Sequence, residues 1–113
     1  MEISDAVAAF NALAQKSRLE IFRLLVQCGP EGMAAGDIAR RLELPHNTLS
    51  FHIAILSRAM LVSSRKDGRS IIYSVDLNGT RELLSFLVED CCHGQPEICG
   101  PLLRSPAVEG CPA

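Results

Sequence analysis

The alternation of hydrophobic and polar positions changes from a helical period to a strand period between residues 36 and 75. Two short stretches of helical spacing are separated by three residues that include Pro45, and this arrangement predicts a helix-turn-helix. The later stretches have strand spacing and meet at Asp67-Gly68, a favoured sequence for a tight hairpin turn. The expected elements are helices over residues 37–42 and 46–56 and strands over residues 62–66 and 69–75.

This order of elements predicts a mainly α fold with a two-stranded β wing, a winged helix-turn-helix. Leu49, Ile53 and Leu56 form an apolar stripe on the second helix, whereas polar side chains crowd its N-terminal half. That half reads base edges in the major groove when such a fold binds DNA. The expected DNA-reading residues are His46, Asn47, Thr48, Ser50 and His52. The alternative for His52 is that its ring braces the helix against the wing.

The formal net charge of the 113 residues is −2, which by itself does not favour a nucleic-acid partner. The distribution of charge does, because residues 36–75 contain six basic and three acidic side chains, a local balance of +3, and the rest of the chain carries −5. Arg65, Lys66 and Arg69 surround the hairpin turn. We expect them to hold DNA phosphates and to make binding sensitive to salt.

Three further helices are predicted outside this unit: one at the N-terminus, one over about residues 17–28 and one that begins near Asn78 or Thr80. Their expected apolar faces are Ile3, Val7, Phe10, Leu13 and Ala14 in the first, Leu19, Phe22, Leu25 and Val26 in the second, and Leu83, Leu84, Leu87 and Val88 in the last. The hydrophobic fraction of 48% exceeds what a small winged helix needs for its own core, which indicates a subunit interface. The alternative for the last helix is that its stripe covers only the core of the monomer.

The expected cellular compartment follows from the absence of a membrane span and of a signal region in the sequence. No stretch is long and apolar enough to span a bilayer, and no basic region followed by an apolar core opens the chain, so we expect a cytoplasmic protein without a membrane partner. In the cytoplasm the five cysteines are expected to be thiols and not a disulfide framework.

Three of these cysteines form a candidate ion site: Cys91 and Cys92 at the end of the last expected helix, and Cys99 a short loop later. A frayed helix end lets adjacent sulfurs turn toward one ion, and a short loop returns the third at little entropic cost. Three thiolates suit a soft ion, and As(III) or Sb(III) takes three sulfurs in a pyramid without a fourth ligand. Zinc or cadmium would need a fourth ligand in a tetrahedron. The candidates for that fourth ligand are His93, Glu97 and Cys111.

An ordered set of short fragments runs through most of the chain. The fragments are residues 12–14, 17–21, 24–25, 49–56 and 61–62, the turn Asp67-Gly68-Arg69, and Tyr73. Together they resemble the ArsR/SmtB family of bacterial winged-helix repressors over about residues 8–90. The resemblance implies a homodimer that pairs through its first and last helices, represses its operon, and leaves operator DNA when a metal or metalloid binds.

The resemblance also bears on the inducer. Many arsenic repressors of this family have a Cys-x-Cys pair on the first helix of the DNA-binding unit, but residues 32–37 contain no cysteine. The Asp, His and Glu set that builds a zinc site on the last helix of other members is missing as well. Some arsenic repressors use adjacent cysteines at the end of the last helix with a third a few residues later, and Cys91, Cys92 and Cys99 resemble that arrangement. This implies a repressor of an arsenic-resistance operon that is released by As(III) or Sb(III).

The chain departs from the family at two positions. Glu43 in the turn and Met60 after the recognition helix stand where family members often have glycine. If these residues adopt positive φ, each is expected to cost about 1 kcal/mol of local strain.

At 113 residues the chain has room for one core. Residues 1–92 are expected to form the DNA-binding and dimerisation domain, and residues 93–113, rich in cysteine, proline and glycine, a tail that completes the inducer site. Two other readings stay open: a winged helix that senses zinc, cadmium or thiol oxidation, and one that only binds other proteins. An enzyme is not expected, because the sequence contains no acid/base pair, nucleophile–base set or phosphate loop.

Overall fold

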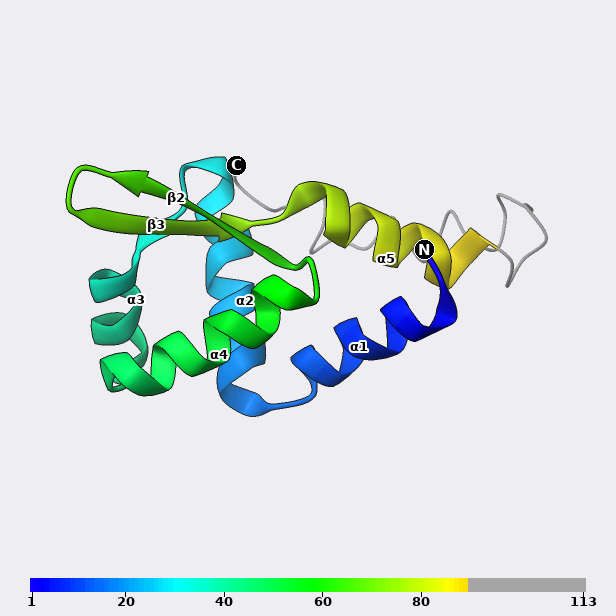
Figure 1. Ribbon diagram of the computed structural model, residues 1–113, viewed down its shortest axis with the longest axis horizontal. Coiled ribbons are helices and arrows are strands. Elements are labelled where there is room, and N and C mark those ends of the chain that lie inside the picture. Colours follow the sequence, from blue (N-terminus) through cyan, green and yellow to red (C-terminus); the bar gives the residue numbers. More distant parts are fainter. Residues whose placement is uncertain (90–113) are drawn as a thin grey trace.

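The computed structural model describes residues 1–89, with Glu89 by its backbone only. The elements are α1 (Ile3–Leu13), α2 (Lys16–Cys28), the 3-10 turn η1 (Gly29–Glu31), β1 (Met33–Ala34), α3 (Ala35–Leu42), α4 (His46–Arg58), β2 (Val62–Asp67), β3 (Ser70–Val75) and α5 (Leu77–Glu89). The predicted fold class is confirmed, since α3 and α4 form the helix-turn-helix and β2 and β3 form the wing (Figure 1). None of the described helices is long and apolar enough to cross a bilayer.

The sheet has one strand more than the two-stranded wing that the sequence predicts. Its order is β1-β3-β2, all antiparallel, and Tyr73 on β3 pairs with Met33 of β1 on one side and with Ser64 of β2 on the other. β1 has only two residues, too few for an alternating pattern to be visible in the sequence. The extra strand ties the wing to the segment that precedes α3.

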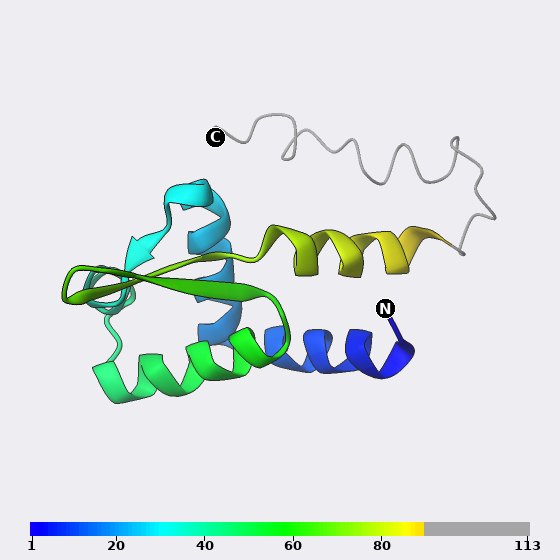
Figure 2. The ribbon, with the colours of Figure 1, turned by 45° about the horizontal axis from the view of Figure 1, so that its top comes forward.

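The core lies where α2, α3 and α4 meet the base of the hairpin. The largest fully buried side chains are Ile21, Leu25, Ile38, Leu49, Leu56 and Leu61. The predicted stripe of α4 is confirmed, because Leu49, Ile53 and Leu56 are all buried. Both α1 and α5 extend from this core at the end opposite the wing tip, and they lie side by side (Figures 1 and 2).

The predicted inward face of α2 is half wrong. Leu25 is buried as expected, but Leu19 and Val26 are 43% and 39% exposed. The fully inward positions are Ile21, Leu24 and Leu25. Apolar side chains occur on more than one side of this helix, so periodicity alone could not select the side that meets the core.

The large apolar side chains of α1 do not enter the core of the monomer. Ile3, Val7 and Phe10 are 71%, 52% and 40% exposed, while the alanines at positions 6, 9 and 12 pack inward. On α5, Leu83 is buried but Leu84 and Leu87 are about half exposed. On α1, small residues therefore face the core. The exposed bulky residues of the two helices, Ile3, Val7, Phe10, Leu84 and Leu87, are apolar side chains outside the core, and we call the surface that carries them the α1/α5 face.

Glu43 and Met60 both adopt the left-handed backbone conformation, with φ of 55° and 63°. Glu43 is the C-cap of α3, and Met60 follows the C-cap of α4. Each position strains an L-residue by about 1 kcal/mol, the expectation drawn from the departures at these sites.

Candidate DNA-binding surface

The outward face of α4 is centred on its N-terminal half. His46, Asn47 and Ser50 are exposed, and Thr48 is partly buried. The Asn47 side chain accepts a hydrogen bond from the Thr48 backbone N–H at 3.0 Å and leaves its amide NH2 group available as a donor. Four of the five predicted DNA-reading residues therefore lie on one accessible stretch of helix.

His52 does not belong to this accessible stretch. It is 8% exposed, and its Nδ1 lies 3.3 Å from a guanidinium nitrogen of Arg18 on α2. Guanidinium groups only donate hydrogen bonds, so Nδ1 accepts and the ring is neutral with its proton on Nε2. The geometry agrees with the bracing alternative for His52, except that the brace meets α2 and not the wing.

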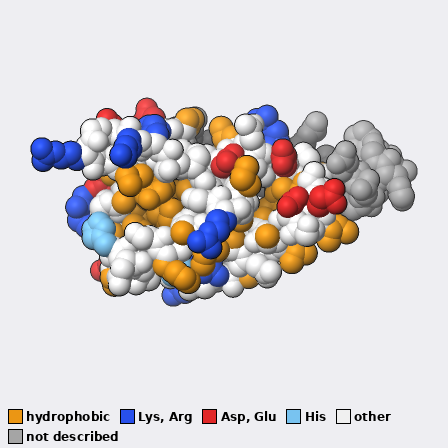
Figure 3. Space-filling model, viewed as in Figure 1, with side chains coloured by type: hydrophobic (Ala, Val, Ile, Leu, Met, Phe, Trp, Pro, Cys, Tyr) orange, Lys and Arg blue, Asp and Glu red, His pale blue; other side chains and the backbone are white. Residues whose placement is uncertain are grey.

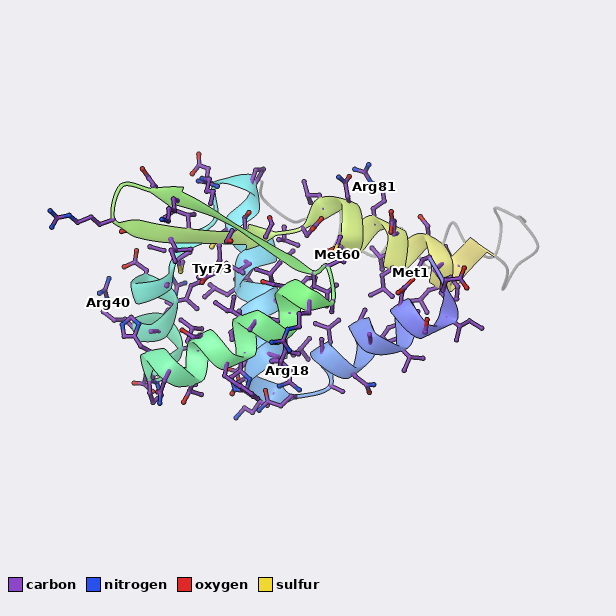
Figure 4. The ribbon with its side chains drawn as sticks, viewed as in Figure 1. Met1, Arg18, Arg40, Met60, Tyr73 and Arg81 are labelled. Atoms are coloured by element: carbon purple, nitrogen blue, oxygen red, sulfur yellow. The ribbon has the colours of Figure 1, made fainter. Side chains whose placement is uncertain are left out.

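Arg18 joins three helices through this contact (Figure 4). Its Nε donates to the Ala12 carbonyl at the end of α1 at 2.7 Å, and its backbone N–H donates to the Gln15 side chain at 2.9 Å. The third link is the His52 ring of the recognition helix. Arg18 thus fixes α4 relative to the helix that carries much of the α1/α5 face.

The stability of the protein is expected to fall in mild acid because of His52. Burial, and secondarily the positive charge of Arg18, hold the pKa of His52 below its ordinary value of 6.5. The unfolded chain then binds more protons than the folded chain in this window, so the unfolding free energy decreases as pH falls through 6.5 toward the lowered pKa. Urea unfolding from about pH 7.5 to about pH 5 measures this slope. His52→Asn keeps an acceptor for Arg18 without titrating, and an unchanged slope in that variant would contradict the assignment.

The wing supplies cations of two kinds. The guanidinium of Arg65 donates to the carbonyl oxygens of Glu31 at 2.8 Å and Pro30 at 3.4 Å, so it ties β2 to η1. The side chains of Lys66 and Arg69 are exposed and make no hydrogen bond or ion pair within residues 1–89. These two side chains are available for phosphates, whereas Arg65 is partly committed to the protein.

Alanine substitutions in the wing should separate these roles. Lys66→Ala and Arg69→Ala are each expected to weaken DNA binding evenly across sequences and to reduce the slope of log affinity against log salt by about 1. Arg65→Ala should also lower the melting temperature, because it removes the link to η1. Fluorescence anisotropy at several salt concentrations and thermal melts measure the two effects. Equal melting temperatures for all three variants would argue against a structural role for Arg65.

Charged side chains are distributed unevenly between the wing end of the molecule and the end formed by α1 and α5. Lys and Arg side chains lie at the wing tip and beside α3, with some acidic side chains among them, and a further group of Asp and Glu side chains lies toward α1 and α5 (Figure 3). Arg40 is partly neutralised by an ion pair with Asp37 on the same helix, while Arg41 and Arg58 are exposed. A polyanion is therefore drawn to the end that presents α4 and the wing.

One residue of this surface was not predicted. Phe51 is 63% exposed and lies one helical turn after Asn47, on the same outward face of α4. The sequence signal was present, since a large apolar residue falls between polar positions outside the Leu49–Ile53–Leu56 stripe.

The predicted ion ligands Cys91, Cys92 and Cys99 lie outside the described residues. Cys28, at the end of α2, is partly buried and packs against the core. Within residues 1–89 no group of three His, Cys, Asp or Glu side chains could hold a metal ion.

Residues 13–65 match a family model described as a helix-turn-helix domain. The transcriptional activator HlyU of Vibrio cholerae is 30% identical over 84 residues, which are 74% of this chain and 75% of HlyU. The transcriptional repressor SdpR of Bacillus subtilis is 29% identical over 89 residues, 79% of this chain and 96% of SdpR.

Two solved structures extend the likeness to three dimensions. The structure of reduced HlyU from Vibrio cholerae has a TM-score of 0.59 at 32% identity and covers 75% of this chain and 90% of its own. The homodimeric winged helix-turn-helix domain of Mb0332 from Mycobacterium bovis, a possible ArsR-family regulator, has a TM-score of 0.64 at 25% identity and covers 80% and 82%. The fold, the exposed polar helix and these relatives define a winged helix-turn-helix transcriptional regulator. More narrowly, the chain belongs to the ArsR-like family of such regulators.

Proposed function

We propose that the protein is a homodimeric repressor that binds the operator of an arsenic-resistance operon and leaves it when As(III) or Sb(III) binds Cys91, Cys92 and Cys99. The observation that carries the DNA-binding part is the exposed face of α4 beside two unpaired wing cations, at the end opposite the α1/α5 face. A reading helix and phosphate contacts on one surface are what recognition of a DNA half-site requires.

Dimerisation through the α1/α5 face is supported by the burial pattern. Bulky apolar residues of two adjacent helices stay exposed while alanines fill the core beneath α1. Several large apolar side chains exposed on two adjacent helices are typical of a protein interface. Two copies joined there would hold two α4 helices for half-sites about one turn of DNA apart, and Mb0332 supports this as a homodimeric relative.

The inducer part rests on the chemistry of the donor set. Two adjacent thiols and a third seven positions after Cys92 fit an ion that takes three sulfurs and no fourth ligand. Repression, and not activation, is the direction we propose, because an ion that loosens the operator complex switches on a resistance operon only if the bound protein blocks it.

A path from the inducer site to DNA is available in the described residues. In the sequence Cys91 and Cys92 follow the end of α5 after one residue, and the first turn of α5 rests on the loop that follows α4. In that joint the Asp76 N–H donates to the Leu61 carbonyl at 2.9 Å, and Gly79 lies against the Met60 carbonyl. A shift of α5 would therefore reach the C-terminal end of the recognition helix through backbone contacts.

Arsenite is expected to lower operator affinity by about 5- to 150-fold, the range of a coupling of about 1–3 kcal/mol. Anisotropy titrations with operator DNA, with and without arsenite, measure this ratio. In a variant with Cys91→Ser and Cys92→Ser the ratio should become 1 while operator affinity without arsenite is unchanged. Cys28→Ser is the matched control, because Cys28 packs against the core far along the chain from the proposed site. Release of the double variant by arsenite would refute the sulfur site.

A second candidate keeps the same DNA-binding surface but makes the adjacent thiols a redox sensor. One observation favours it: HlyU, whose reduced form has been solved as a structure, is among the relatives. Peroxide would then release the operator and dithiothreitol would restore binding, with no response to arsenite.

A further inference from the structure

The reading face of α4 mixes polar and apolar groups in a defined order. Successive helix residues are about 100° apart, so Asn47, Phe51 and Arg58 point to nearly the same side, with Ser50 and Ala54 beside them. The buried residues of α4 lie on the opposite side. Phe51 is therefore the largest apolar group on the side that would face the major groove.

The exposure of Phe51 is not explained by the core. It is 63% exposed and is not among the residues packed on the hydrophobic cluster. Its described ring contact is an edge-on approach to His52, with centroids 5.6 Å apart and planes at 64°. Because His52 is held by Arg18, this contact orients the Phe51 ring while leaving most of it open.

Subunit pairing does not explain it either. The α1/α5 face is formed by helices at the end of the molecule opposite the wing tip, whereas the N-terminal half of α4 lies with α3 on the wing side (Figures 1 and 2). Phe51 lies beside Asn47 and Ser50 in this part of α4, so it is on the same surface as the side chains that are available to base edges.

We propose that Phe51 is a specificity-determining residue that reads the C5-methyl group of one thymine in each operator half-site. A phenyl ring cannot form hydrogen bonds with base edges, and in the major groove only thymine presents a methyl group. Ala54, one turn further on, is too small to keep a base edge away from the ring. Polar neighbours would fix the register by hydrogen bonds, and Phe51 would add a preference that hydrogen bonding alone does not give. The inference rests on the proposed DNA-binding function.

The test replaces single thymines by deoxyuridine, which removes the methyl group and keeps every hydrogen-bonding atom of the base. The probe is a duplex selected from a randomised library by the full-length protein, with each thymine of a half-site replaced in turn. At one position per half-site the affinity of the unchanged protein should fall about four-fold, and about fifteen-fold when both half-sites are changed, as expected for one buried methyl group each.

Phe51→Ala should bind the unmodified duplex more weakly and be indifferent to deoxyuridine at that position. Phe51→Leu, which keeps an apolar contact, should retain part of the discrimination. Ser50→Ala is the matched control: whatever its overall affinity, its ratio of thymine to deoxyuridine affinities should match that of the unchanged protein. Because Phe51 is exposed, thermal melts of its variants should coincide with that of the unchanged protein.

The outcomes separate the two proposals. If the unchanged protein selects a duplex but responds to deoxyuridine at no position, or if Phe51→Ala responds just as strongly, the methyl reading is overturned and DNA binding stands. A uniform loss for Phe51→Ala with the full deoxyuridine response would assign the ring to the sugar-phosphate backbone, and also overturns it. If no duplex is selected at all, the proposed function itself fails.

Discussion

Replacing Gly79 by alanine is expected to destabilise the protein by about 3 kcal/mol, although both residues are compatible with a helix. A Cβ atom at position 79 would lie 1.7 Å from the Met60 carbonyl oxygen and 2.8 Å from the Met60 carbonyl carbon. Both obstacles are backbone atoms, so no side-chain rotation relieves the clash. The start of α5 would have to move away from the loop after α4 and lose the hydrogen bond from the Gly79 N–H to Asp76.

Thermal melts at fixed protein concentration measure this effect, which corresponds to a decrease in melting temperature of about 10–20 °C. Gly36→Ala is the matched control, since Gly36 also lies in the first turn of a helix. A Cβ there would meet nothing closer than an Arg40 guanidinium nitrogen at 3.9 Å. That variant should be more stable by about 0.5 kcal/mol, because alanine favours helix over glycine. Similar melting temperatures for the two variants would refute the close contact between α5 and Met60.

The sequence predicted well those elements of the DNA-binding unit that depend on interactions between residues close in the chain. The helix-turn-helix and the hairpin follow from the helical or strand period of hydrophobic positions over short stretches and from the turn at Asp67-Gly68. They could therefore be placed in the sequence without knowledge of any long-range contact. The positive φ at Glu43 and Met60 could also be anticipated from the departure from glycine.

Long-range contacts account for what the sequence did not predict. Arg65 looked like a phosphate ligand because of its position near the turn, and only the fold brings the Glu31 carbonyl within reach of its guanidinium. His52 looked accessible because it is polar, but the rotation of α4 that buries Ile53 also turns His52 toward Arg18. The prediction of the inward face of α2 was half wrong for a similar reason, since the packing partner and not the periodicity selects the buried side.

The other large effect is expected from a substitution on the α1/α5 face. Leu84→Glu, on the α1/α5 face, is expected to convert the proposed dimer into a monomer and to weaken operator binding by about 100- to 10,000-fold. A carboxylate at this position would have to be buried without a partner in the interface, whereas in the monomer Leu84 is 48% exposed and tolerates it. The affinity falls because a monomer binds only one half-site. In a dimer, binding of the first recognition helix holds the second one at a high effective concentration near its own half-site, and a monomer lacks this effect.

Leu19→Glu separates this effect from charge alone. Leu19 is 43% exposed on α2, so the variant adds the same charge at similar exposure on a helix that does not contribute to the α1/α5 face. Sedimentation velocity should give a monomer for Leu84→Glu and a dimer for Leu19→Glu, and anisotropy titrations should show the large loss only for the former. The residual binding of Leu84→Glu should be the same for a duplex with one half-site as for a duplex with two, because a monomer cannot use the second. A dimeric Leu84→Glu protein with full operator affinity would show that α5 does not form the interface, and the path from the cysteines to DNA would then have to run within one subunit.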